Sequence, residues 1–334
     1  MRHKATGPYF AVIRVGPALA GHQGSASGSP VQLRKINNPV HEDVISKAPM
    51  RPVVTNGRAE ITFQASDRPG AQAVLDHLYY RDPMKILFPR PMADDLVTAA
   101  LVTTSGGMVG GDCLAFKGGV GPGAAGLFTA QAAEKIYRSL GPDCKMDVVL
   151  RAEDGGWLEW LPQETILFDG ARLRRTTQVH VAGSGRVLAG EIMVFGRLAR
   201  GEVFEHGLAR DAWDVSVDGR PVWRDALHLE GDIRRILDHP ASFAGARACA
   251  TAILAGQDAP SHLDFARACL LPVAGDVDAD DGVLAAATAM KGVLVMRWLS
   301  QDPMKLRRSY GAWWAAFRHG IQGLPARLPR LWDI

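Results

Sequence analysis

Six carboxylates stand in apolar, strand-like segments, where their type and position could support chemistry. They are Asp112, Glu159, Glu164, Asp169, Glu191 and Glu202. A charge inside a sheet is costly unless it is paired or faces water, so two interpretations remain open. The simpler one pairs the carboxylates with nearby arginines, namely Arg172, Arg174, Arg175, Arg197 and Arg200. In the other, some carboxylates line a water-filled passage, where hard oxygen ligands weakly hold a passing divalent cation. Residue types alone favour the ion pairs.

Two glycine-rich segments resemble nucleotide-binding loops but lack what those loops need. Gly106–Gly111 reads GGMVGG and is followed by Asp112, where a phosphate-binding loop carries lysine. A carboxylate would repel phosphates, so this segment predicts a tight turn in which Asp112 caps backbone N–H groups or faces a cavity. Gly121–Gly126 fits the spacing GxGxxG without a strand–helix context, which favours a type II turn at Pro122-Gly123. A nucleotide-dependent enzyme stays a minor alternative that would require specific NAD or ATP binding.

Other sequence signatures of catalysis and metal binding are missing. No two of the ten histidines lie within four residues of each other, so the sequence contains no local zinc or nickel pair. No serine stands in a nucleophile elbow, and none of the four cysteines belongs to a CxxC pair. Sequence chemistry alone therefore gives no active site, and we expect no catalytic residues and no tightly bound cofactor.

The elements that must position the carboxylates are predicted to be mainly β-strands. Turn residues recur roughly every ten positions up to about residue 232, a spacing typical of an extensive β architecture. Alternating residues predict a strand over 173–181, and Asp218-Gly219 predicts a hairpin turn. A helix that begins with proline is expected over 302–319. Residues 1–58 contain Gly/Ser-rich and Pro-containing stretches and are expected to form a loosely ordered extension before a single β-rich domain over 59–334.

Composition and charge limit which kinds of partner and which cellular compartment we expect. The 334 residues include 38 Lys and Arg against 35 Asp and Glu, a net charge of +3. No long basic run is present, which argues against a nucleic-acid or membrane-surface partner. No apolar stretch is long enough to span a membrane, and the apolar run at 9–13 is too short for a signal peptide. The unpaired cysteine pattern suits a reducing compartment, so we expect a cytoplasmic protein.

Several motifs together resemble the urease accessory protein family UreD, also called UreH. They are TSGGMVGGD at 104–112, TAQAAEKIYRS at 129–139, LEWLPQETILFDGA at 158–171, FGR through RGEVFEHG at 195–207, and the closing RLPRLWDI at 327–334. The resemblance covers about 59 to 334 and is strongest from 96 to 230. Motifs of this length in the family's order are far more specific than a single glycine pattern.

The resemblance implies a fold and a function as expectations. The fold would be mainly β, with stacked sheets that wind in a β-helical topology and few helices. The chain would be a non-enzymatic chaperone that binds the urease apoprotein and acts with the accessory protein UreF and the GTPase UreG in nickel insertion. Asp112 and Glu202 match the first candidates for a transient Ni²⁺ passage, followed by Glu164 and Asp169. The alternative is a pure docking scaffold that does not handle nickel directly.

Overall fold

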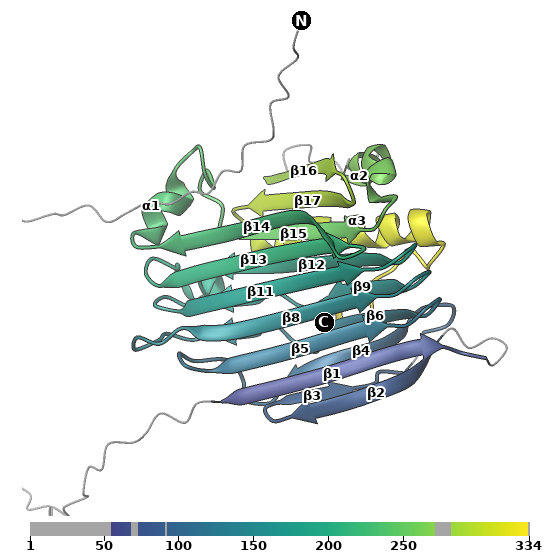
Figure 1. Cartoon of the computed structure of the whole chain (residues 1–334). Coiled ribbons are helices and arrows are strands. Elements are labelled where there is room, and N and C mark those ends of the chain that lie inside the picture. The colour runs from purple at the N-terminus through teal and green to yellow at the C-terminus, as the bar shows by residue number, and fades with distance from the viewer. Residues whose placement is uncertain (1–54, 68–72, 91, 271–281, 333–334) are drawn as a thin grey trace, which may run out of the picture.

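Two β-sheets packed face to face form the body of the protein (Figure 1). The computed structural model describes residues 55–67, 73–90, 92–270 and 282–332. The seven-stranded sheet contains β1 (Asn56–Ala65), β2 (Ala73–Arg81), β5 (Cys113–Val120), β8 (Cys144–Ala152), β11 (Arg172–Val181), β13 (Leu208–Val217) and β14 (Arg220–Glu230). The ten-stranded sheet contains β3 (Met84–Leu87), β4 (Val97–Thr103), β6 (Ala125–Ala130), β7 (Glu134–Ile136), β9 (Trp157–Leu161), β10 (Thr165–Leu167), β12 (Arg186–Phe195), β15 (Ala248–Ala255), β16 (Val283–Met290) and β17 (Val293–Ser300).

The chain winds from one sheet to the other, so that successive coils stack. In the seven-stranded sheet β1, β5, β8, β11 and β13 are all parallel neighbours, and in the other sheet β4, β6, β9 and β12 are parallel. Parallel strands require crossover connections, and here each crossover passes through the opposite sheet. The loops that precede β5, β8, β11 and β13 therefore all lie on one side of the stack, where these strands begin. We call this side the loop end; tight turns close the opposite side, where these strands finish.

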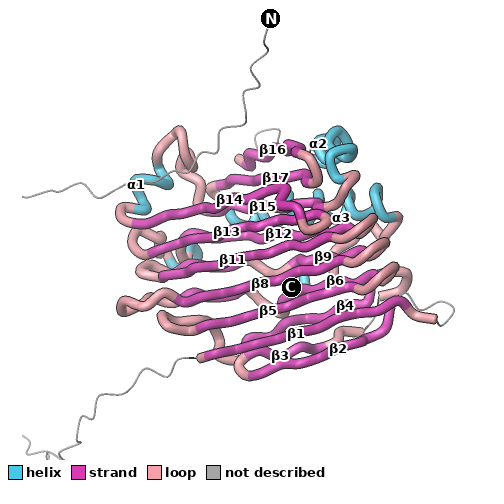
Figure 2. Tube along the Cα trace, in the orientation of Figure 1, coloured by secondary structure: helices cyan, strands magenta, loops and turns pink. Residues whose placement is uncertain are grey.

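Few helices accompany the sheets, and Figure 2 shows them at the periphery. They are α1 (Ile233–Asp238), α2 (Leu263–Leu270), α3 (Pro303–Gln322) and the 3₁₀ turns η1 (Leu198–Arg200), η2 (Ala259–His262) and η3 (Arg330–Trp332). The side chain of Asp302 caps α3 by accepting hydrogen bonds from the N–H groups of Met304 and Lys305. Within the described residues, no helix is both long and apolar enough to cross a membrane.

Two apolar layers hold these elements together. One lies between the sheets and includes Phe116, Phe128 and Trp160, whose rings stack on one another or meet edge to face. The second lies between the outer face of the ten-stranded sheet and α3. There Trp298 of β17 packs edge to face on Tyr310 and Trp313 of α3. Strands covered by apolar layers on both faces, such as β9 and β12, are buried at nearly every position.

The mainly β class and the winding of stacked sheets are confirmed, as is the C-terminal helix. The hairpin at Asp218-Gly219 joins β13 to β14, and both residues have positive φ, as a type I′ turn requires. Of the predicted extension over 1–58, residues 1–54 lie outside the described residues. Residues 56–58 belong to β1, which begins at Asn56 and pairs with β5 from that residue onward.

Candidate functional site

Asp112 closes the glycine-rich turn between β4 and β5. Its side chain is almost fully buried, and its two oxygens accept hydrogen bonds from the N–H of Val109 at 2.9 Å and of Thr55 at 3.2 Å. Three glycines of the turn have positive φ, which explains why glycine is needed there. The carboxylate thus caps backbone N–H groups, one of the two roles expected from the sequence.

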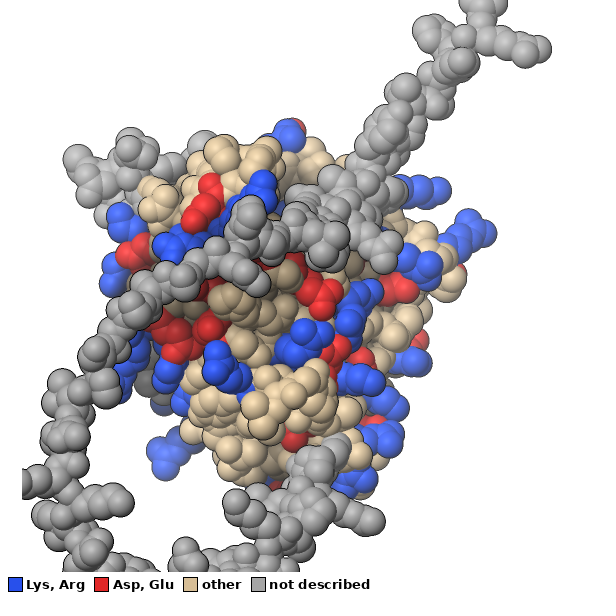
Figure 3. All heavy atoms as spheres, turned by 90° about the vertical axis from the view of Figure 1, so that its left-hand side faces the viewer, with Lys and Arg blue, Asp and Glu red and all other residues tan. Residues whose placement is uncertain are grey.

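Asp169 and Glu202 meet at the loop end. The N–H of Asp169 donates to Glu202 Oε1 at 2.8 Å, and the guanidinium of Arg197 holds the other oxygen of Glu202. Asp169 itself accepts from the N–H groups of Glu205 and His206. Burial opposes ionisation, but hydrogen bonds from Arg197 to Glu202 and from backbone N–H groups to Asp169 outweigh it, so both carboxyls have a lowered pKa. Figure 3 views the molecule from the loop end and shows acidic and basic side chains interleaved there.

Glu164 points toward the C-terminal segment instead. It accepts a hydrogen bond from Arg307 Nη1 of α3 at 2.5 Å, and the Arg307 guanidinium lies over the ring of Trp332 at 4.2 Å. The structure therefore brings Asp169 and Glu202 together, whereas the side chains of Asp112 and Glu164 contact other elements.

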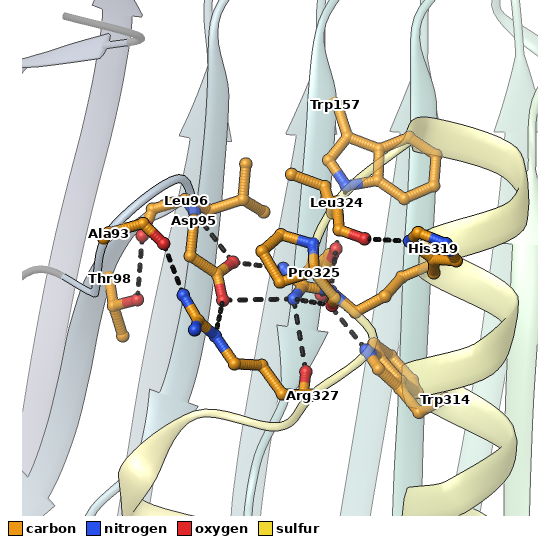
Figure 4. Close-up of polar contacts among 12 residues, drawn as sticks. Ala93, Asp95, Leu96, Thr98, Trp157, Trp314, His319, Leu324, Pro325 and Arg327 are labelled. Carbon is orange, nitrogen blue, oxygen red and sulfur yellow. Dashed lines mark hydrogen bonds and ion pairs between the residues drawn. The ribbon is translucent and has the colours of Figure 1, made fainter.

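Glu159 is the most deeply buried carboxylate of the six, with no exposed surface. On the outer side of the ten-stranded sheet it accepts hydrogen bonds from the indoles of Trp157 and Trp314 and from Arg318 Nε at 3.0 Å. Arg318 also binds Asp95 and the carbonyl oxygens of Pro325 and Arg327 (Figure 4). This network fastens α3 and the chain that follows it to the sheet, so its role is structural.

The space between the sheets contains two adjacent cavities. The larger has a volume of about 120 Å³ and opens at the loop end, where Gly106, Gly107 and Glu134 contribute to its lining. The smaller has a volume of about 30 Å³ and reaches Asp225 of β14 and Thr251 of β15. Arg175 and Glu191 line both cavities, so this pair forms the wall between them.

A buried ion triad occupies that wall. Arg175 Nη1 donates to Glu191 Oε2 at 2.6 Å and to Thr165 Oγ1 at 3.0 Å, while its Nε donates to Asp211 Oδ1 at 2.8 Å. The indole of Trp160 donates to the other oxygen of Glu191 at 2.8 Å. Arg175 and Asp211 lie opposite each other on the parallel strands β11 and β13, with Glu191 facing them from β12. Two buried carboxylates thus share one guanidinium.

Burial changes the protonation of these groups. It raises the pKa of Glu191 to about 7, an effect that Arg175 opposes and Asp211 reinforces. Burial also raises the pKa of Glu134, despite the hydrogen bond from Thr103. Near neutral pH, Glu191 is therefore present in both its protonated and its ionised form. Burial raises the pKa of Cys249, in the smaller cavity, to about 12, so this thiol is protonated at neutral pH when no cation is bound.

Several buried donors near the triad have no hydrogen-bond partner among the residues that the structure describes. They include Arg175 Nη2, Thr177 Oγ1 and Trp213 Nε1. Thr177 and Trp213 lie opposite each other on β11 and β13, two positions beyond Arg175 and Asp211. Such groups are normally satisfied by water when protein offers no acceptor, which indicates a polar interior. Within the described ranges, no group of three or more His, Cys, Asp or Glu side chains is arranged to hold a metal ion.

Sequence reasoning identified part of this interior. It named Glu191 among the six carboxylates and Arg175 among the candidate partners, and the structure joins them. It did not single out Asp211 or Glu134. The available signal was the alternation in 173–181, which places the charged Arg175 on the same buried face as Leu173 and Val179. A charge on an apolar face requires a partner from elsewhere in the chain.

Comparison with known proteins matches this chain to one family. The family model described as UreD urease accessory protein matches residues 55–333. The chain is 48% identical over 263 residues to the urease accessory protein UreD of Magnetococcus marinus, covering 79% of this chain and 90% of the relative. It is 41% identical over 266 residues to that of Methylobacterium sp. strain 4-46, covering 79% and 90%, and 40% identical over 279 residues to UreD 1 of Methylobacterium radiotolerans, covering 84% and 92%.

Proposed function

Because the chain belongs to the UreD family of urease accessory proteins, which gives it a role in urease maturation, we propose that it guides Ni²⁺ to the urease apoprotein through its own interior. The ion is cargo and would be held only transiently. The observation that supports the proposal is the pair of cavities joined at Arg175 and Glu191. An enclosed route would keep the ion from competing ligands in solution.

The chemistry of the lining suits transient passage. Carboxylate oxygens can bind a divalent cation, but few of them converge at one point, so affinity stays low and release stays fast. Glu134 lies at the opening and Glu191 at the wall, which provides successive acidic positions along the route. For an ion to pass the wall, the Arg175 guanidinium must give up Glu191, and deprotonation of Glu191 near pH 7 supplies the charge that attracts the ion.

None of the four carboxylates selected from the sequence lines either cavity, so in this proposal they would act outside the two cavities, before an ion enters them. We propose Asp112 and Glu202 as the first of these positions and Glu164 and Asp169 as the next, and expect Asp112→Ala and Glu202→Ala to lower the nickel content of urease without preventing complex assembly. In the full proposal the protein works in the cytoplasm, in a complex with the urease subunits, UreF and the GTPase UreG. GTP hydrolysis would belong to UreG, in keeping with the acidic Asp112 where a phosphate-binding loop needs lysine.

A matched pair of variants tests the route. Glu191→Gln keeps the size of the side chain but removes the acidic oxygen shared by both cavities. Glu159→Gln is the control, because Glu159 is equally buried and also pairs with an arginine, but lies outside the cavities. Urease would be activated with each variant at limiting nickel, and its nickel content measured alongside co-purification of the accessory complex. We expect Glu191→Gln to lower nickel content with assembly intact, and Glu159→Gln to leave the nickel content per assembled complex unchanged.

The second candidate is a docking scaffold that never contacts nickel. The observation that favours it is the saturation of Asp112, Asp169 and Glu202 by backbone and arginine donors. A scaffold would give normal urease nickel content with Glu191→Gln and would bind no nickel above a nonspecific control in equilibrium dialysis. Those two results together would contradict the interior route.

A further inference from the structure

One end of the stacked sheets exposes apolar side chains that point inward. Among the described residues, β2 is the outermost strand of its sheet at this end and pairs only with β1. Leu78 and Tyr80 lie opposite Ile61 and Ala59, which are fully buried between the sheets, and residues opposite each other share a face. Nevertheless Leu78 is 37% exposed and Tyr80 is 46% exposed. The layer between the sheets is therefore uncovered at β2.

The other end of the same sheet is different. There β14 is also an edge strand, but its apolar residues Trp223 and Leu229 are buried. Stacked β architectures need covered or polar ends to remain soluble as monomers, and edge strands are normally short or guarded by inward-pointing charges. In β2, nine residues long, every residue from Val74 to Arg81 is exposed, and its inward positions are apolar. This strand is built to be covered by something.

We propose that β2 of a second copy of this chain covers it, so that two molecules join through antiparallel β2 strands related by a two-fold axis. Pairing Tyr79 with Tyr79 of the second copy keeps inward residues against inward residues. That register places Leu78 opposite Tyr80 of the second copy, and Tyr80 opposite its Leu78. Both uncovered apolar layers close against each other, and the free backbone groups of both edges gain partners.

The outward face of the strand is complementary in the same register. The bulge in β2 places Asp76 on the outward face, where it accepts a hydrogen bond from Thr62. In the proposed register, Arg81 lies opposite His77 of the second copy and beside its Asp76. The two-fold axis repeats the same contact, so that Asp76 of the first copy lies beside Arg81 of the second. The strand is thus self-complementary in the placement of its apolar and its charged side chains, which is the property an isologous dimer needs.

Sedimentation of the full chain tests the dimer. Its mass should double as concentration rises into the tens of micromolar, and Leu78→Lys or Tyr80→Lys should keep it monomeric while leaving the circular dichroism spectrum unchanged. Leu284→Lys on β16 is the matched control, because β16 is an exposed edge strand of the other sheet and Leu284 is 65% exposed. This variant should still dimerise.

Cross-linking tests the register. Two Tyr79→Cys side chains on the axis should form a disulfide-linked dimer under mild oxidation, whereas Lys85→Cys, on the outward face of β3, should not exceed the background of the unsubstituted chain. A monomeric mass throughout the concentration range, or a dimer that survives both Leu78→Lys and Tyr80→Lys, would overturn the proposal. A monomeric chain whose Leu78→Lys variant loses association with urease or the accessory proteins would also overturn it, and would assign the edge to another protein.

Discussion

The protonation of Glu191 makes a quantitative prediction about folding stability. Its pKa lies at about 7 in the folded protein, against an ordinary value of 4.5, because burial outweighs the attraction of Arg175. In the unfolded chain the carboxyl loses its proton first as pH rises. The folded state therefore holds more protons between these two values, and stability falls with rising pH in that window.

The size of the effect follows from the two pKa values. Proton linkage gives a contribution to the free energy of unfolding that decreases by about 2.5 kcal/mol from pH 5 to pH 8, most of it below pH 7. Glu191→Gln removes the titration while keeping the hydrogen-bonding shape. The difference in unfolding free energy between the native chain and this variant should therefore fall by about that amount over this range.

Urea denaturation at a series of pH values measures the difference. Titrations of other groups cancel because they occur in both chains. Glu202→Gln is a control of opposite sign, because the Arg197 hydrogen bond outweighs burial and lowers the pKa of Glu202. The stabilisation that ionised Glu202 contributes is therefore present above pH 4.5 and lost in acid. It stays constant from pH 6 to pH 8. The reasoning is refuted if the unfolding free energy of the native chain minus that of Glu191→Gln stays constant or rises with pH. That result would mean that Arg175 stabilises the ionised carboxylate more than burial penalises it.

Three further variants test individual contacts by urea or thermal unfolding. Arg318→Met leaves Glu159 buried without its cationic partner and should cost about 3 to 5 kcal/mol; a loss under 1 kcal/mol would show that the two tryptophan donors suffice. Gly190→Ala would place a Cβ 2.1 Å from the Tyr310 hydroxyl oxygen, so overpacking should cost about 1 to 3 kcal/mol; an unchanged midpoint would mean that the tyrosine moves freely. Asp112→Ala leaves two backbone N–H groups without an acceptor and should cost about 1 to 3 kcal/mol, with Asp112→Asn closer to the native chain because it keeps one acceptor oxygen.

The sequence predicts the class of fold well because the relevant signals are local. Alternation in 173–181 places Leu173 and Val179 on the buried face that β11 shows, and Asp218-Gly219 specifies its hairpin by conformational preference alone. The beginning of β1 at Asn56 was missed because its first residues are stabilised by pairing with β5, 57 positions away, and nothing in the adjacent sequence carries that information.

The site is harder to predict because its members belong to separate coils. Arg175, Glu191 and Asp211 come together only when β11, β12 and β13 are stacked in register. Sequence proximity suggested arginine partners for all six carboxylates, and it succeeds for Glu202 with Arg197, five positions away. It fails for Glu159, whose partner Arg318 is 159 positions away on α3. Charge pairing is therefore predictable where the partners are near in sequence, as for Glu202 with Arg197 and Glu191 with Arg175, and not where they come from distant elements.

The two arginine networks differ in how completely the described protein groups satisfy the guanidinium. Arg318 has each of its three nitrogens bonded to Glu159, Asp95 or nearby carbonyl oxygens, as expected of a group that fastens a helix to a sheet. Arg175 is equally buried, but its Nη2 has no partner among the described residues, and its two carboxylates line the cavities. A buried donor without a protein partner is normally satisfied by water, so Arg175 combines strong ion pairs with a polar opening beside them. In the passage that we propose, such a guanidinium would be displaced more easily than that of Arg318 when a divalent cation takes its place between Glu191 and Asp211.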